Sequence, residues 1–126
     1  MSKILLIEDE KIVRDVFVDF LNYGGFDVTA LENGLETDTC LAKNQYDVLI
    51  TDLVLPFKSG IDIIRETRSQ YNDLIIIALT GGARVTTMSP DSEAVQAGAN
   101  ICLLKPISGM DLITNINLFL QAKKAS

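Results

Sequence analysis

Four apolar runs of this 126-residue chain each stop at polar residues that could hold or transfer a phosphoryl group. These polar residues are Glu8 and Asp9, Asp52, Thr80 and Lys105. A carboxylate can attack phosphorus to give an acyl phosphate, and a hydroxyl and an ammonium can bind the oxygens of the group in transfer. Three carboxylates held together also favour a divalent cation with oxygen ligands, such as Mg²⁺.

Each of these residues also has an ordinary structural explanation. Asp9 could be only a helix N-cap, and Asp52 only a turn residue. Thr80 could belong to a glycine-rich turn, and Lys105 could mark the exit of a strand. Their joint appearance at the ends of apolar runs favours one shared site.

Alternating strands and helices must position these residues. Strands are expected at 4–7, 28–31, 48–51, 74–79 and 101–104. Helices are expected at about 12–23, 35–43, 61–70 and 89–98. A last helix is expected to carry Leu112, Ile113, Ile116, Phe119 and Leu120 inward. Alternation of this kind is typical of a parallel sheet with crossover helices. The first helix is expected to carry one apolar stripe, formed by Ile12, Val13, Val16, Phe17, Phe20 and Leu21.

Strand composition indicates the strand order. The runs at 4–7, 48–51 and 74–79 are almost wholly apolar, as in strands covered on both faces, whereas 28–31 suits a sheet edge. We therefore predict an α/β fold of the flavodoxin-like, doubly wound type, with a five-stranded parallel sheet in the order 2-1-3-4-5 and five helices. Ligands of such sheets bind beyond the carboxyl ends of the strands, where the polar residues lie.

Composition excludes several functional classes. The chain is 48% apolar and 22% charged, as expected for one globular domain spanning residues 1–126. Short apolar runs and the lack of an export signal predict a cytoplasmic protein without membrane contact. The net charge of −6 disfavours direct binding to nucleic acid. The chain has no histidine, which excludes histidine triads, histidine metal ligands and a phosphohistidine of its own.

Longer motifs around the polar residues resemble the receiver domain of two-component response regulators. They follow one another along essentially the whole chain, at 7–10, 52–56 with Gly60, 78–80, 97–99 and 105–106. By this resemblance, Asp52 is the phospho-acceptor. Mg²⁺ would be bound by Asp9, Asp52 and the backbone carbonyl of Val54, with Glu8 acting through water. Thr80 would be the switch hydroxyl and Lys105 the phosphate-binding lysine, joined to Pro106 by a cis peptide bond.

The resemblance also implies a signalling role rather than an enzymatic one. The phosphoryl group would come from a sensor histidine kinase, a histidine phosphotransfer protein or a small acyl phosphate. Phosphorylation would shift an existing equilibrium and change the face formed by the fourth helix, the fifth strand and the fifth helix. We expect no output domain after residue 124, so that the signal passes to an unidentified downstream protein.

Several positions depart from the family pattern. Cys102 stands at the output switch position, where the family usually has Tyr or Phe. The stretch from Thr80 to Gly98 is a few residues longer than usual. Val54 and Gly82 offer no side chain that could position an attacking water, so we expect slow self-dephosphorylation.

Other functional classes fit the residues less well. A phosphatase of the haloacid-dehalogenase type would need an Asp two residues after Asp52, where Val54 stands. A flavin mononucleotide carrier would need a hydroxyl-rich loop after the first strand, where residues 8–10 are acidic. A degenerate receiver that acts only as an interaction module is a further alternative.

Overall fold

Strands and helices alternate along the chain, as the sequence predicts. The computed structural model describes residues 1–81 and 90–125. The strands in this part of the chain are β1 (Lys3–Ile7), β2 (Asp27–Leu31), β3 (Val48–Asp52), β4 (Ile75–Thr80) and β5 (Ile101–Leu104). The helices are α1 (Lys11–Tyr23), α2 (Thr37–Lys43), α3 (Gly60–Gln70), α4 (Pro90–Ala97) and α5 (Gly109–Ala125).

The five strands form one parallel sheet in the order β2-β1-β3-β4-β5, which confirms the predicted flavodoxin-like arrangement. Every residue of β3 and β4 is buried, whereas three of the five residues of β2 are exposed. The apolar composition of the central strands is therefore explained by cover on both faces, and the polar composition of β2 by its place at an edge.

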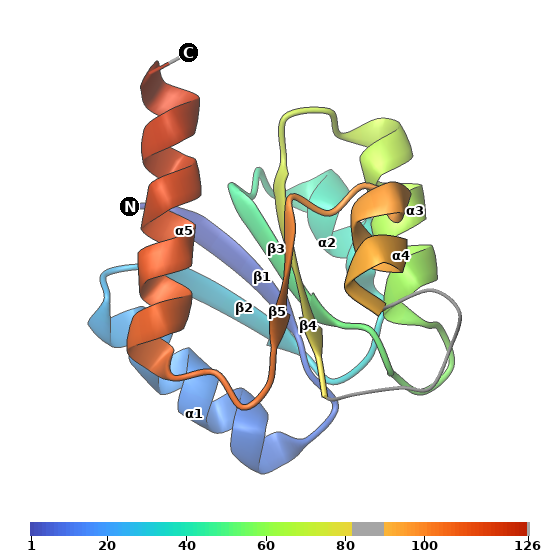
Figure 1. Cartoon of the computed structure of the whole chain (residues 1–126), viewed down its shortest axis with the longest axis horizontal. Coiled ribbons are helices and arrows are strands. Elements are labelled where there is room, and N and C mark those ends of the chain that lie inside the picture. Colours follow the sequence, from blue (N-terminus) through green and yellow to red (C-terminus); the bar gives the residue numbers. More distant parts are fainter. Residues whose placement is uncertain (82–89, 126) are drawn as a thin grey trace.

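Helices cover both faces of the sheet, with α1 and α5 on one side and α2, α3 and α4 on the other (Figure 1). Successive residues of each strand point to opposite faces. In β1, Ile4 and Leu6 join the apolar core under α1 and α5, whereas Leu5 and Ile7 join the second core. The central strands are thus fixed from both sides, and so are the residues at their ends.

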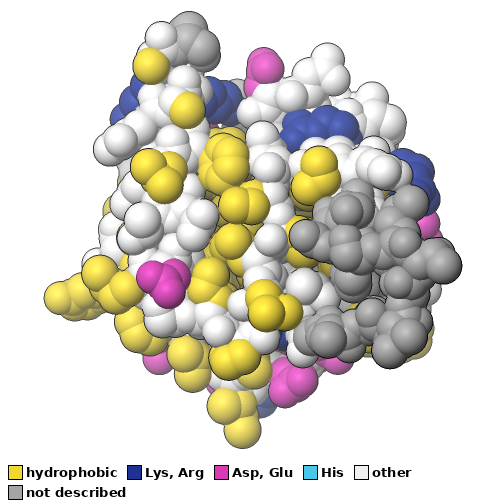
Figure 2. Space-filling view, in the orientation of Figure 1, with side chains coloured by type: hydrophobic (Ala, Val, Ile, Leu, Met, Phe, Trp, Pro, Cys, Tyr) yellow, Lys and Arg dark blue, Asp and Glu magenta, His cyan; other side chains and the backbone are white. Residues whose placement is uncertain are grey.

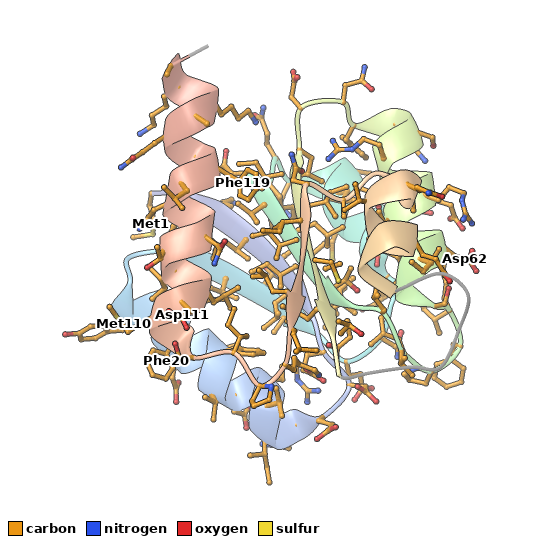
Figure 3. The ribbon with its side chains drawn as sticks, viewed as in Figure 1. Met1, Phe20, Asp62, Met110, Asp111 and Phe119 are labelled. Atoms are coloured by element: carbon orange, nitrogen blue, oxygen red, sulfur yellow. The ribbon has the colours of Figure 1, made fainter. Side chains whose placement is uncertain are left out.

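The apolar stripe predicted for α1 is buried on one side and exposed on the other. Phe17 and Leu21 are buried, but Ile12 is 80% exposed and Val16 is 47% exposed. Adjacent helical positions point about 100° apart, so six paired positions cover a wider arc than the sheet can bury. Phe20, 38% exposed, reaches the start of α5, where a Cβ on Gly109 would lie 2.1 Å from the ring (Figure 3).

The strand β5 lies at the second edge of the sheet and is only half-buried. Apolar side chains are visible along this strand between α5 and α4 (Figure 2). Leu104, its last residue, is 63% exposed. Among the described residues, none of the helices is long and apolar enough to cross a membrane.

Candidate functional site

Strand register brings the predicted carboxylates together. Ile7 of β1 pairs with Thr51 of β3, so the residues that follow them, Glu8 and Asp52, are neighbours at the carboxyl edge of the sheet. Glu8 is fully buried and Asp52 is 4% exposed, whereas Asp9 is exposed. One carboxylate oxygen from each of the three residues lies within 4.8 Å of the others.

The predicted hydroxyl and ammonium come from the next two strands. Thr80 is the last residue of β4, and its backbone carbonyl accepts a hydrogen bond from the N–H of Lys105, at 2.7 Å. The Nζ of Lys105 lies 2.9 Å from Oδ1 of Asp52 and 3.1 Å from Oε1 of Glu8. The peptide bond between Lys105 and Pro106 is cis. The structure therefore brings together all five polar residues on which the sequence interpretation depends.

The environment of Asp52 disfavours its negative charge. Burial and the neighbouring carboxyl group of Glu8 raise the pKa of Asp52 to about 7, although the ammonium of Lys105 opposes this shift. The carboxylates of this site repel one another, and a cation bound between them would reduce this repulsion.

The same neighbours favour the charged forms of Glu8 and Lys105, in contrast to Asp52. Burial raises the pKa of Glu8, but Asp52, the backbone N–H of Glu10 and Lys105 together hold this pKa below its ordinary value. Burial lowers the pKa of Lys105, but the two carboxylates outweigh it and raise that pKa. Glu8 and Lys105 are therefore the charged pair that borders the acceptor.

The oxygen atoms of this site fit a hard divalent cation. Oδ1 of Asp52 is buried and has no hydrogen-bond partner among the residues that the structure describes, and its contact with Lys105 is an ion pair. Buried polar atoms in proteins are rarely left in this condition. A set of three carboxylates within 4.8 Å of one another matches the ligand preference of Mg²⁺.

The loop that follows β3 folds back onto the backbone of Asp52. The N–H of Gly60 donates to the carbonyl of Leu53 at 2.8 Å. A Cβ atom at position 60 would lie 1.9 Å from the carbonyl oxygen of Asp52. Only glycine fits this close approach, which explains why Gly60 belongs to the motif around the acceptor.

The structure decides two of the structural alternatives. The N-cap of α1 is Glu10 rather than Asp9, and the side chain of Glu10 makes no capping hydrogen bond. Asp52 is the last residue of a buried strand rather than a turn residue.

The side chain of Val54 is 62% exposed, and Gly82 lies outside the described residues. The metal-binding role of the Val54 carbonyl remains a prediction.

Cys102, at the predicted output switch position, lies opposite Ala78 in the neighbouring strand. It is half-buried against the apolar core under α2, α3 and α4. Its switching role remains a prediction.

Sequence reasoning missed the direct contact between Glu8 and Lys105. The two residues are 97 positions apart, and no local sequence pattern predicts their contact. The sequence assigned Glu8 to the metal alone, whereas in the structure Oε1 accepts from Lys105 and Oε2 accepts from the N–H of Glu10, at 3.0 Å. Only the joint placement of β1 and β5 in one sheet could have indicated this pair.

Comparison with known proteins agrees with this geometry. The response regulator receiver domain family matches residues 4–117. The response regulator receiver protein CpdR of Brucella abortus is 34% identical over 97% of this chain and 99% of that protein. The response regulator SaeR of Staphylococcus aureus is 30% identical over 98% of this chain, which spans 53% of SaeR.

A solved receiver domain shares both the fold and part of the sequence. The structure of a response regulator receiver domain protein from Clostridium thermocellum superposes with a TM-score of 0.88, at 31% identity over 99% of this chain and 98% of that one. Sequence, fold and the acidic cluster of Glu8, Asp9 and Asp52 thus agree. This chain belongs to the response regulator receiver domain family.

Proposed function

We propose that Asp52 accepts a phosphoryl group and thereby switches the domain between two signalling states. The observation that supports this proposal most strongly is the contact of the buried Oδ1 of Asp52 with the ammonium of Lys105, at 2.9 Å, beside the carboxylates of Glu8 and Asp9. A carboxylate that must react needs an accessible lone pair and a nearby positive charge.

The transfer forms one bond and breaks another. A carboxylate oxygen of Asp52 attacks phosphorus, and the bond from phosphorus to the donor nitrogen or oxygen breaks, with its electron pair leaving on the donor. Lys105 balances the negative charge that collects on the phosphoryl oxygens, and the hydroxyl of Thr80 donates to one of them. The backbone hydrogen bond between Thr80 and Lys105 holds these two groups together.

We propose that Mg²⁺ binds to Asp9, Asp52 and the backbone carbonyl of Val54, with Glu8 acting through water. Both oxygens of Glu8 already accept hydrogen bonds within the protein, which supports an indirect role for this residue. A bound Mg²⁺ would neutralise the carboxylates and the phosphoryl oxygens.

The donor would be a sensor histidine kinase, a histidine phosphotransfer protein or a small acyl phosphate. The chain itself contains no histidine, so a phosphohistidine must come from a partner. We propose a cytoplasmic domain that signals through α4, β5 and α5, the face on which β5 is half-exposed.

Acetyl phosphate tests the acceptor without a kinase. The protein is incubated with acetyl phosphate and Mg²⁺, or with EDTA in place of Mg²⁺, and its intact mass is measured. We expect one added phosphoryl group on the wild type with Mg²⁺ and none on Asp52→Ala. Asp62→Ala, which removes a carboxylate that is 55% exposed on α3, is the matched control and should be labelled normally (Figure 3). An unlabelled wild type, or equal labelling of Asp52→Ala, would contradict the proposal.

A further inference from the structure

An arginine outside the carboxylate cluster contacts the backbone that carries two of its members. Arg14 is the fourth residue of α1, and its Nη1 donates to the carbonyl oxygen of Glu8 at 2.9 Å. The same nitrogen reaches the carbonyl oxygen of Asp9 at 3.4 Å. Arg14 is therefore linked to the loop between β1 and α1 without touching either carboxylate side chain in these contacts.

These contacts hold the backbone around Asp9, which is the carboxylate residue of the site that is least fixed by packing. Glu8 is fully buried and Asp52 lies in a buried strand, so both are held by their surroundings. Asp9 is exposed. The two carbonyl groups that Arg14 contacts belong to the peptide planes on either side of the Asp9 Cα. Anchoring both planes sets the direction of the bond from Cα to Cβ in Asp9.

We propose that Arg14 is a positioning residue for the divalent cation. It holds the backbone of Glu8 and Asp9 so that the Asp9 carboxylate stays within ligand distance of Asp52. This inference rests on the proposed function, because it concerns the same cation. Groups behind the metal ligands commonly change metal affinity about ten- to a hundredfold when they are removed.

The positive charge of Arg14 allows backbone positioning to be distinguished from the direct effect of that charge on the cation. A guanidinium beside a cation site repels the cation, so its removal should tighten Mg²⁺ binding if charge alone matters. Its removal should weaken Mg²⁺ binding if the two backbone contacts matter more. The two accounts therefore predict opposite signs for one measurement.

The experiment compares Arg14→Gln with Lys11→Gln in the full chain. Lys11 lies on the same helix, is 77% exposed and pairs with Asp15, so its loss removes the same charge but leaves the carbonyls of Glu8 and Asp9 untouched. The Kd for Mg²⁺ is measured by titration calorimetry. We expect about a tenfold weaker Kd for Arg14→Gln and an unchanged or slightly tighter Kd for Lys11→Gln. Arg14→Gln binding as tightly as wild type, or both variants weakening equally, would overturn the proposal.

A kinetic measurement separates positioning from general damage. With acetyl phosphate, we expect Arg14→Gln to need about tenfold more Mg²⁺ for half-maximal labelling and to reach nearly the wild-type maximum rate. A lower maximum with an unchanged Mg²⁺ requirement would contradict a positioning role. If wild type binds Mg²⁺ but is not labelled at Asp52, the proposed function fails, and the Kd comparison still decides the role of Arg14.

Discussion

Two regions of this protein bury charge in opposite ways. The guanidinium of Arg68, near the end of α3, is half-buried, and three of its nitrogens donate hydrogen bonds of 2.9 to 3.0 Å. The acceptors are the carbonyl oxygens of Gly98, Tyr71 and Asn72 and the Oδ1 of Asn100. In the acidic site, by contrast, Oδ1 of Asp52 forms an ion pair with Lys105 at 2.9 Å, but burial and the neighbouring carboxyl group of Glu8 oppose its negative charge. The charge of Arg68 is satisfied by neutral acceptors, whereas the charge of Asp52 is held beside a like charge.

Arg68 connects the end of α3 with two turns of the chain. Its partners lie in the turn after α3 and in the turn between α4 and β5. Its stem also packs against Gly98, where φ is +130° and a Cβ would lie 2.6 Å from the Arg68 side chain. Asn100 in turn accepts from the N–H of Ile76 in β4, at 2.8 Å. Arg68 thus fixes the carboxyl end of α4 to the sheet.

Removing the hydrogen-bonded guanidinium of Arg68 should have the largest effect on stability. We expect Arg68→Ala to lower the free energy of unfolding by about 3 kcal/mol, because the acceptors lose hydrogen bonds to a charged donor. Urea unfolding measures this change. Arg65→Ala, which removes an arginine that is 64% exposed and pairs with Asp62, is the matched control and should cost less than about 0.5 kcal/mol. Equal losses for the two variants would remove the distinction between the two regions.

Removing the crowded charge of Asp52 should have the opposite effect on stability. We expect Asp52→Asn to raise the free energy of unfolding of the metal-free protein by about 2 kcal/mol at pH 8. The folded pKa of Asp52 is raised from 3.8 to about 7, so this carboxyl destabilises the fold progressively as pH rises through that range. The advantage of the variant should therefore shrink toward pH 5. Urea unfolding in EDTA at both pH values measures it, and a variant less stable than wild type at pH 8 would contradict this account.

A smaller effect on stability is expected from backbone strain in the loop beside the acidic site. Phe57 has a φ of 69°, in the left-handed region, and its side chain is 80% exposed. We expect Phe57→Gly to raise the free energy of unfolding by about 1 kcal/mol, because glycine adopts this backbone without strain. Phe57→Ala is the control, since it removes the ring but keeps the Cβ that causes the strain. A gain of equal size in both variants would assign the cost to the exposed ring instead.

The sequence predicted the features that follow from strand ends and apolar runs. Strand order could be inferred because β2 is visibly less apolar than β1, β3 and β4, and this order brings Glu8, Asp52 and Lys105 to one edge. The contacts of Arg14 and Arg68 could not be predicted, because their acceptors are mainly backbone carbonyls, which every residue has. The exposed half of α1 was missed because apolar periodicity does not show how wide a face the fold covers. The backbone of Phe57 was missed because the left-handed region is typical of glycine, and a phenylalanine gives no signal for it.

The central claim is that Asp52 itself carries the phosphoryl group, and borohydride trapping tests it most directly. Hydride reduces an acyl phosphate to an alcohol, which converts a phosphorylated aspartate to homoserine. The protein is treated with acetyl phosphate and Mg²⁺, reduced, digested and sequenced by tandem mass spectrometry. We predict homoserine at position 52 alone, and none when EDTA replaces Mg²⁺. Homoserine at another aspartate, or an unmodified Asp52 in protein that has gained a phosphoryl group, would contradict the account.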